Sequence, residues 1–161
     1  MIARPSFLVV GTTLFALFLT AAAILSPVPA GLELLAPEYV GALRLREAEG
    51  IPRGRVCDMT ADAWQYRELL RGRHPEIWFQ SVFDHAVTPE ARLYGLAGLR
   101  ATDSLAFLQA LRAVPATAWA APVRIFDQEV LLGHRLPALS LLPVLVTGDL
   151  GREWMLERPE C

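Results

Sequence analysis

The sequence predicts a mainly α-helical protein, in which one N-terminal transmembrane helix precedes a small domain of antiparallel helix pairs. Two observations support this fold class. The segment from Phe7 to Leu25 is apolar and carries no charged side chain. Between about Thr60 and Val114, apolar residues recur every three or four positions, and the intervals between these runs are only a few residues long.

The apolar run is long enough to cross a bilayer. As a helix it would span roughly 28 Å, close to the thickness of the hydrocarbon layer. Arg4 is the only basic side chain before it, and basic residues stay on the cytoplasmic side. We therefore expect a cytoplasmic N-terminus and a periplasmic C-terminal domain at the bacterial inner membrane. A cleaved signal peptide is the alternative, because Val28-Pro29-Ala30 is an acceptable cleavage site.

This pattern divides the chain into three regions. Residues 1–30 are predicted to be a transmembrane anchor or uncleaved signal, and residues 31–56 a juxtamembrane helix and linker. Residues 57–161 are predicted to be an extracytoplasmic helical domain.

Small side chains recur at intervals of four within the apolar run, at Thr12, Ala16 and Thr20. Such a stripe lets a second transmembrane helix approach closely, which makes these residues candidates for membrane helix packing. The alternative is that Ala and Thr are simply common in leader segments.

Composition excludes some classes of function. The formal net charge is −2, and no basic stripe indicates a nucleic-acid partner. All 15 basic residues are Arg, and Asn is absent, which suggests a GC-rich bacterial genome. Cys57 and Cys161 are the only cysteines, and a periplasmic location would permit a disulfide between them. Two separate thiols are the alternative.

A helix is expected from Pro37, with Glu38 in its first turn, until Gly50 stops it. We expect it to pack on the domain, with a position in the lipid headgroup layer as the alternative. The segment from Gly50 to Arg55 is expected to be a linker.

Four short helices are expected next. They begin near Thr60, at Pro75, at Pro89 after a Thr88 cap, and at Thr102-Asp103. Their predicted inward faces are Ala63, Tyr66, Leu69 and Leu70; Phe79, Val82, Phe83 and Ala86; Leu93, Leu96, Ala97 and the stem of Arg100; and Phe107, Leu108, Leu111 and Val114.

Gly95 and Gly98 interrupt the third of these helices. With Ala91 they form a smooth patch on which another helix can sit. We expect this helix to belong to the same domain, and a partner surface is the alternative.

The pattern changes after Pro115. Residues 123–126 alternate and are rich in β-formers, and 129–132 could pair with them, which predicts a short β-hairpin near 123–132. The apolar stretch 136–146 contains two prolines and is expected to cover the helical core, with an apolar partner surface as the alternative. A last helical turn is expected after Gly151.

The block from Pro89 to Asp103, PEARLYGLAGLRATD, resembles one in uncharacterised secreted or membrane-anchored proteins of GC-rich bacteria. The resemblance covers about residues 61–114, and its helix pairs also resemble those of HEAT-type repeats. It implies paired short helices and no named activity. A clean internal period is missing, so a long solenoid is not expected.

Catalytic signatures are missing, including the common metal, nucleotide and hydrolase motifs. His74, His85 and His134 lack ligand spacing, so we expect neither enzyme activity nor a metal or other cofactor. Glu68, Glu76 and Glu90 are expected to be solvated. The aromatic residues Trp64, Tyr66, Trp78 and Phe79 are expected in the core, with a ligand groove or partner contact as the alternative.

These observations favour a non-catalytic accessory or structural subunit of a bacterial membrane protein complex, for example a photosynthetic or respiratory one. Its expected partners are membrane lipid and other membrane protein subunits, and not nucleic acid. The alternative is a cleaved, periplasmic or secreted helical binding protein. An unrecognised hydrolase that uses scattered His and Glu residues is a third hypothesis.

Overall fold

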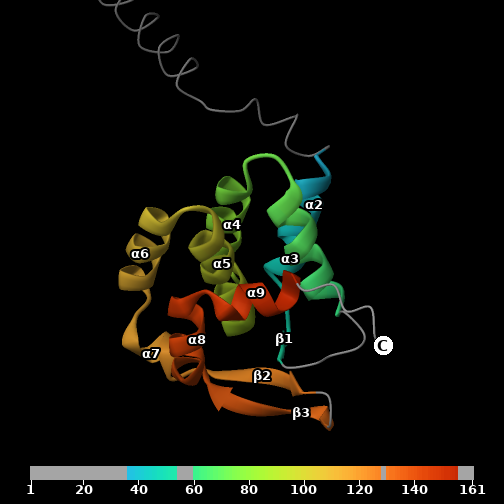
Figure 1. Ribbon diagram of the computed structural model, residues 1–161. Coiled ribbons are helices and arrows are strands. Elements are labelled where there is room, and N and C mark those ends of the chain that lie inside the picture. Colours follow the sequence, from blue (N-terminus) through green and yellow to red (C-terminus); the bar gives the residue numbers. More distant parts are fainter. Residues whose placement is uncertain (1–35, 54–59, 128–129, 156–161) are drawn as a thin grey trace, which may run out of the picture. The chain divides into compact units, whose positions relative to one another are not determined.

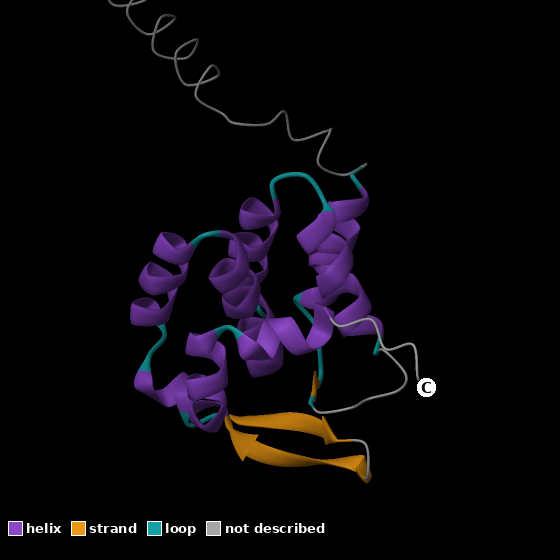
Figure 2. Ribbon diagram, viewed as in Figure 1, coloured by secondary structure: helices purple, strands orange, loops and turns teal. Residues whose placement is uncertain are grey.

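Helices dominate the part of the chain that the computed structural model describes, which comprises residues 36–53, 60–127 and 130–155 (Figures 1 and 2). The helical segments are α2 (Pro37–Leu45), α3 (Ala61–Arg71), α4 (Pro75–Asp84), α5 (Pro89–Thr102), α6 (Ser104–Ala113), α7 (Ala116–Trp119), a 3-10 turn η2 (Ala138–Leu141), α8 (Leu142–Thr147) and α9 (Asp149–Met155). The strands are β1 (Ile51–Pro52), β2 (Pro122–Asp127) and β3 (Val130–Pro137). The predicted mainly helical fold class is confirmed.

The predicted helix starts are formed by side-chain caps. Thr60 Oγ1 accepts a hydrogen bond from the Ala63 amide at 3.2 Å, and Thr88 Oγ1 accepts one from the Ala91 amide at 3.0 Å. Asp103 Oδ1 accepts from two amides of the first turn of α6, each at 2.9 Å. Each cap satisfies helix N–H groups that have no partner within the helix, which is why these boundaries can be predicted locally.

Helix α5 lies at the centre of the described residues. It contacts α3, α4, α6, α8, α9, η2 and β2, and every residue from Leu93 to Leu99 is buried. This burial confirms the inward positions predicted at Leu93, Leu96 and Ala97. In α6 the prediction is wrong for Leu108, which is 45% exposed. Phe107 is buried, as predicted, and Ala110 is buried in place of Leu108, because the inward stripe of α6 lies about 100° around the helix from Leu108.

The glycine patch on α5 is covered by α4. A Cβ atom on Gly95 would lie 2.7 Å from the Phe83 backbone nitrogen, and one on Gly98 would lie 2.0 Å from the Phe79 ring. Ala91 is fully buried. The two glycines therefore allow α4 and α5 to pack closely, as expected. Because Ala91, Gly95 and Gly98 are covered within the domain, the alternative of a partner surface at these residues is wrong.

The three strands form one sheet in the order β1-β2-β3. β2 and β3 are antiparallel, which confirms a hairpin, but Val123 pairs with Leu136 and Ile125 with His134. The expected pairing with residues 129–132 is therefore displaced toward the C-terminus. β1 runs parallel to β2, with Ile51 opposite Ile125. A strand thus occupies part of the segment that the sequence suggested was a linker.

The cap residue of α5 and two side chains within α5 hold β2 and the segment that leads into β1. Thr88 Oγ1 donates to the Ala48 carbonyl at 2.5 Å, and Tyr94 Oη donates to the Gly50 carbonyl at 3.3 Å. Glu90 Oε1 accepts from the Arg124 amide at 2.6 Å. Glu90 is only 6% exposed, so the expectation that it is solvated is wrong.

The chain after β3 closes the core. Leu141 and Leu145 are fully buried, which confirms that the apolar stretch 136–146 covers the helices, and Leu150 after it is also fully buried. The helical turn predicted after Gly151 is part of a longer helix, α9, which begins at Asp149. Its Trp154 is buried, and the Trp154 indole nitrogen donates to the Pro52 carbonyl at 2.9 Å.

Helix α2 packs on α3 and α4, as expected, and buries Gly41, Ala42 and Leu45. Among the described residues, every helix is too short or too polar to cross a bilayer. The apolar run 7–25, with the stripe Thr12, Ala16 and Thr20, lies outside the described residues. Cys57 and Cys161 also lie outside them, so the anchor, the stripe and the disulfide stay predictions.

Candidate functional site

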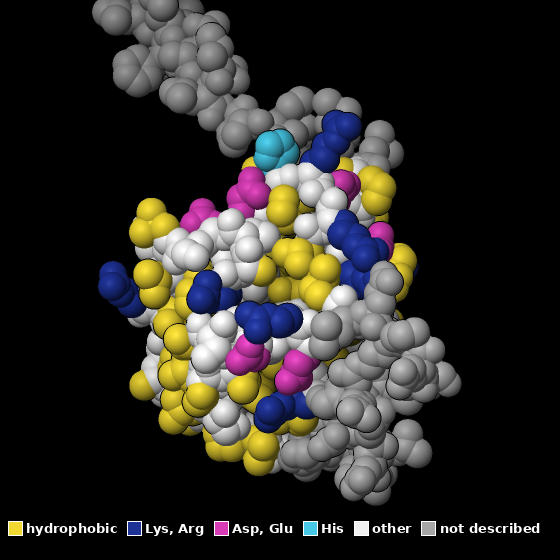
Figure 3. Space-filling model, viewed as in Figure 1, with side chains coloured by type: hydrophobic (Ala, Val, Ile, Leu, Met, Phe, Trp, Pro, Cys, Tyr) yellow, Lys and Arg dark blue, Asp and Glu magenta, His cyan; other side chains and the backbone are white. Residues whose placement is uncertain are grey.

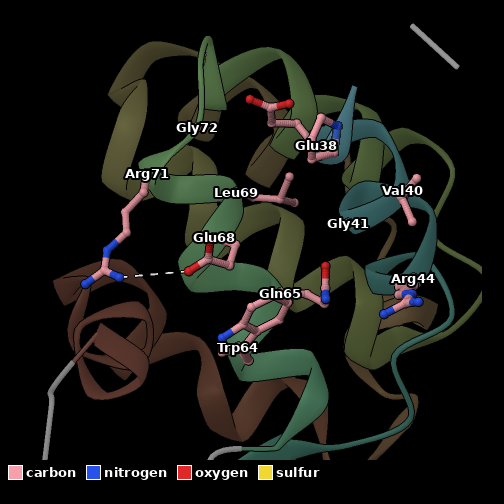
Figure 4. A pocket seen from close by; sticks show the side chains of 11 residues that line it. Glu38, Val40, Gly41, Arg44, Trp64, Gln65, Glu68, Leu69, Arg71 and Gly72 are labelled. Carbon is pink, nitrogen blue, oxygen red and sulfur yellow. Dashed lines mark ion pairs between the residues drawn. The ribbon is translucent and has the colours of Figure 1, made fainter. Parts of the chain in front are cut away.

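A groove of about 480 Å³ lies between α2 and α3 and is the candidate interaction site (Figure 4). We call it the α2–α3 groove. It is lined by Pro37, Glu38, Val40, Gly41 and Arg44 of α2, and by Trp64, Gln65, Glu68, Leu69, Arg71 and Gly72 of α3 and its C-terminal end.

The floor of the groove forms where the two helices approach closely. Gln65 and Leu69 point from α3 toward α2 (Figure 4), and Gly41 is the residue that they meet. A Cβ atom on Gly41 would lie 2.9 Å from Gln65 Oε1 and 3.4 Å from Leu69 Cδ2. Because Gly41 has no side chain, α2 can rest directly on α3 and leave a shallow channel beside the contact.

One end of the groove is fixed by Glu38. Its Oε1 accepts a hydrogen bond from the Arg73 amide at 3.4 Å. A Cβ atom on Gly72 would lie 2.8 Å from Glu38 Cγ, so the Glu38 side chain packs directly against the end of α3. The start of α2 is thereby tied to the end of α3.

Two apolar side chains at the groove are largely exposed to solvent. Trp64 is 50% exposed and Val40 is 45% exposed. Leu43, one helical turn after Val40 on α2, is also exposed. Tryptophan is among the residues that contribute most to binding when a partner buries them, so this surface is suited to a protein contact.

Charges of both signs border the groove, from Glu38, Arg44, Glu68 and Arg71. Glu68 and Arg71 approach to 3.9 Å, and both side chains are about half exposed. Neither a histidine nor a cysteine or hydroxyl side chain lines the groove. The arrangement can therefore hold an apolar segment with polar flanks.

The aromatic residues singled out from the sequence separate into two groups. Tyr66 and Phe79 are fully buried, with ring centroids 5.0 Å apart, which confirms the core prediction for them. Trp78 is partly buried and donates its indole N–H to the Arg73 carbonyl at 3.1 Å. Trp64 lies at the groove, so the core prediction is wrong for this residue.

The histidines are not brought together. His74 is exposed before α4, where its Nδ1 lies 3.4 Å from Glu76 Oε1. His85 ends α4 and its Nδ1 lies 3.0 Å from the Ser81 carbonyl. The side chain of His134 lies outside the described residues. Within the described ranges, no three His, Cys, Asp or Glu side chains are grouped so as to hold a metal ion.

No family model matches this chain, and no curated protein or solved structure is significantly similar to it. The argument for function therefore depends on the residues themselves.

Proposed function

We propose that this protein is a non-catalytic accessory subunit of a bacterial membrane protein complex. The apolar segment 7–25 anchors it in the inner membrane, and its helical domain lies in the periplasm. The observation that carries the proposal is the α2–α3 groove, where Trp64 presents a large apolar surface to solvent beside charges of both signs.

The proposed occupant is an amphipathic helix of a neighbouring subunit. Helix-in-groove recognition places apolar side chains every third or fourth residue against an apolar floor, and polar flanks meet the rim. Val40, Leu69 and Trp64 would meet the apolar side chains of the partner. Arg44 and Glu68 lie at the rim and would select the register of the partner's charged residues.

The anchor favours a partner at the same membrane. Only residues 26–36 separate the apolar run from α2. Even fully extended, they would reach roughly 40 Å. A domain tethered at that distance meets other subunits of the same membrane at a high effective concentration, so that modest affinity at the groove is sufficient.

Substitution at the groove tests this proposal. The full chain carrying Trp64→Glu should separate from its complex on mild detergent extraction and native electrophoresis, whereas the wild type migrates with the other subunits. Loss of a central tryptophan typically costs about 2 kcal/mol or more, roughly a thirtyfold weaker contact.

The matched control is Leu105→Glu, since Leu105 is a large apolar side chain on α6 that is 67% exposed. This variant should stay in the complex. Equal retention of both variants in the complex would contradict the role of the groove. If the wild-type protein migrates as a single chain without other subunits, the accessory-subunit proposal is contradicted.

A second candidate function is a cleaved periplasmic or secreted binding protein, favoured by the Val28-Pro29-Ala30 site. The two candidates differ in the mature N-terminus. The binding protein would start near Gly31, whereas the anchored subunit keeps the apolar segment.

A further inference from the structure

An apolar stripe with an arginine at its end lies on the outer side of α6. Leu105, Leu108 and Arg112 are all exposed. Their spacing of three and four residues places them on one side of the helix. The other side, with Phe107 and Ala110 buried, packs on α5. We call Leu105, Leu108 and Arg112 the α6 face, and none of them lines the α2–α3 groove.

The elements beside α6 also expose apolar side chains. Arg100 of α5 joins α6 to α8, because its Nε donates to the Val146 carbonyl at 2.9 Å and its guanidinium carbon lies 5.8 Å from the centre of the Phe107 ring. Val146 is exposed, and so is Leu139 of the adjoining η2. Figure 3 shows hydrophobic side chains gathered on the side of the domain that carries α6 and α7. The leucines of α6 are therefore part of a wider apolar surface.

The charged residues of this region have one sign. Residues 104–126 and 130–148 include α6, α7, η2 and α8, and they contain Arg112, Arg124 and Arg135 but neither Asp nor Glu. All 17 acidic residues of the chain lie elsewhere in the sequence. Arg112 and Arg135 are exposed. An apolar surface with basic residues and without acidic ones is complementary to a bilayer whose headgroups are anionic.

We propose that the α6 face rests on the surface of a bilayer that contains anionic lipids. Leu105 and Leu108 enter the boundary between headgroups and acyl chains, and Arg112 contacts lipid phosphate. The α2–α3 groove differs from this face, because charges of both signs border it. The inference rests on the anchor of the proposed function and adds a second contact with the membrane.

The anchor makes so small a face sufficient. Two leucines and one arginine would bind a bilayer only weakly on their own, because little apolar area is buried. Residues 26–36 keep the domain within roughly 40 Å of the proposed anchor, so that the second contact forms at a high effective concentration. The α6 face therefore determines how the domain lies on the membrane, and the anchor determines that it is there.

Spin-label accessibility tests the proposal on the full chain in lipid nanodiscs, without other subunits. A nitroxide is attached to Leu108→Cys in a background that carries Cys57→Ser and Cys161→Ser. Oxygen dissolves in lipid and a nickel chelate stays in water, so lipid contact raises the collision rate with oxygen and lowers that with nickel. Adding phosphatidylglycerol to phosphatidylcholine nanodiscs should lower the nickel rate by about fivefold, the effect of one arginine at an anionic surface.

The matched control is Ile77→Cys, since Ile77 is an exposed apolar residue on α4 that follows Glu76. Its label should meet nickel equally in both kinds of nanodisc. Arg112→Gln should restore nickel access to the Leu108→Cys label. Hydrogen exchange of the unsubstituted chain is a second measurement, and α6 amides should exchange more slowly when phosphatidylglycerol is present.

Three results would overturn the α6 face. The first is a nickel collision rate at Leu108→Cys that phosphatidylglycerol does not change, together with unchanged exchange of α6. The second is equal protection of the Leu108→Cys and Ile77→Cys labels. The third is a low collision rate with both oxygen and nickel at Leu108→Cys, which would indicate burial against protein, a second copy of the chain included.

These results differ from those that test the proposed function. A chain that does not elute with the nanodiscs on size exclusion would contradict the anchor, and the inference would fall with it. A chain that elutes with them but keeps its Leu108→Cys label in water would overturn the α6 face alone. Leu105→Glu should disrupt this face and still stay in the complex, because the groove is intact.

Discussion

Glu90 joins the central helix to the sheet through one carboxylate. Ile51, the first residue of β1, pairs with Ile125 of β2, so the amide of the preceding residue, Arg124, lies beyond the end of β1. Glu90 Oε1 accepts from this amide and takes the place of a strand carbonyl. A buried backbone N–H must have a partner, which explains why a charged residue is buried in this position.

Removal of the Glu90 carboxylate is therefore predicted to lower the free energy of unfolding. Glu90→Ala should lower it by about 2 kcal/mol, because the Arg124 amide loses its acceptor, and Glu90→Gln should lower it less, because an amide oxygen can still accept. Urea denaturation followed by circular dichroism measures both. Glu68→Ala is the control and should change the free energy by less than about 0.5 kcal/mol, since Glu68 is half exposed. Equal losses for Glu90→Ala and Glu68→Ala would contradict the role of Glu90.

Tyr66 makes the free energy of unfolding depend on pH in the alkaline range. Burial raises the pKa of the Tyr66 phenol above its ordinary value of 10.0. The neutral phenol is favoured in the folded state, so its contribution to stability is complete below pH 10.0 and is lost as the pH rises above that value.

Above pH 10, Tyr66→Phe should therefore reduce the slope of the free energy of unfolding against pH. The reduction should be up to about 1.4 kcal/mol per pH unit, the limit for one proton. Denaturant titrations at several pH values on either side of 10 measure the slope. Identical slopes for the variant and the wild type would contradict this assignment.

At the residue scale, the sequence predicts caps better than it predicts buried polar contacts. Thr88 and Asp103 bond to amides two or three residues away, so their roles can be inferred from local sequence. Glu90 finds its partner 34 residues away, and nothing in the local pattern distinguishes it from an exposed first-turn acid. Trp64 was misplaced for a similar reason, because its exposure depends on where α2 lies.

At the scale of elements, the α4–α5 pair depends on two glycines. The side chains that these glycines meet belong to α4, and the Phe83 backbone lies within 3 Å of a Cβ atom placed on Gly95. Backbone atoms cannot move aside without displacing the helix.

Gly95→Ala is thus predicted to destabilise the fold, although alanine is the better helix former by about 1 kcal/mol. We expect the free energy of unfolding to fall by about 1–3 kcal/mol, the usual effect of overpacking a core. Gln109→Ala, an exposed change on α6, serves as the control and should be nearly neutral. A rise in stability for Gly95→Ala would show that α4 does not lie against this face of α5.

Helix existence was predictable from periodicity, and strand pairing was not. The repeat of apolar residues at three and four positions located α3 to α6 correctly. β1 has only two residues, too few for any periodic pattern, and it pairs with Ile125 and Phe126 far along the chain. The sequence pattern does not predict the full length of β3, because its last residues, Leu136 and Pro137, also begin the apolar stretch 136–146.

At the scale of the whole molecule, the account joins an apolar N-terminal segment to a helical domain that carries the α2–α3 groove. The groove lies on the described helices nearest in sequence to that segment. It could not be predicted from sequence, because it is formed by residues from two helices that only the fold brings together. A tethered interaction domain is the hypothesis that uses both the segment and the groove.

The most direct test of the tether is the intact mass of the native protein in carbonate-washed membranes. The account predicts that the chain stays in the membrane fraction with the full mass of 17.7 kDa. Recovery of the protein only in the soluble fraction, with a mass reduced by that of residues 1–30, would contradict it.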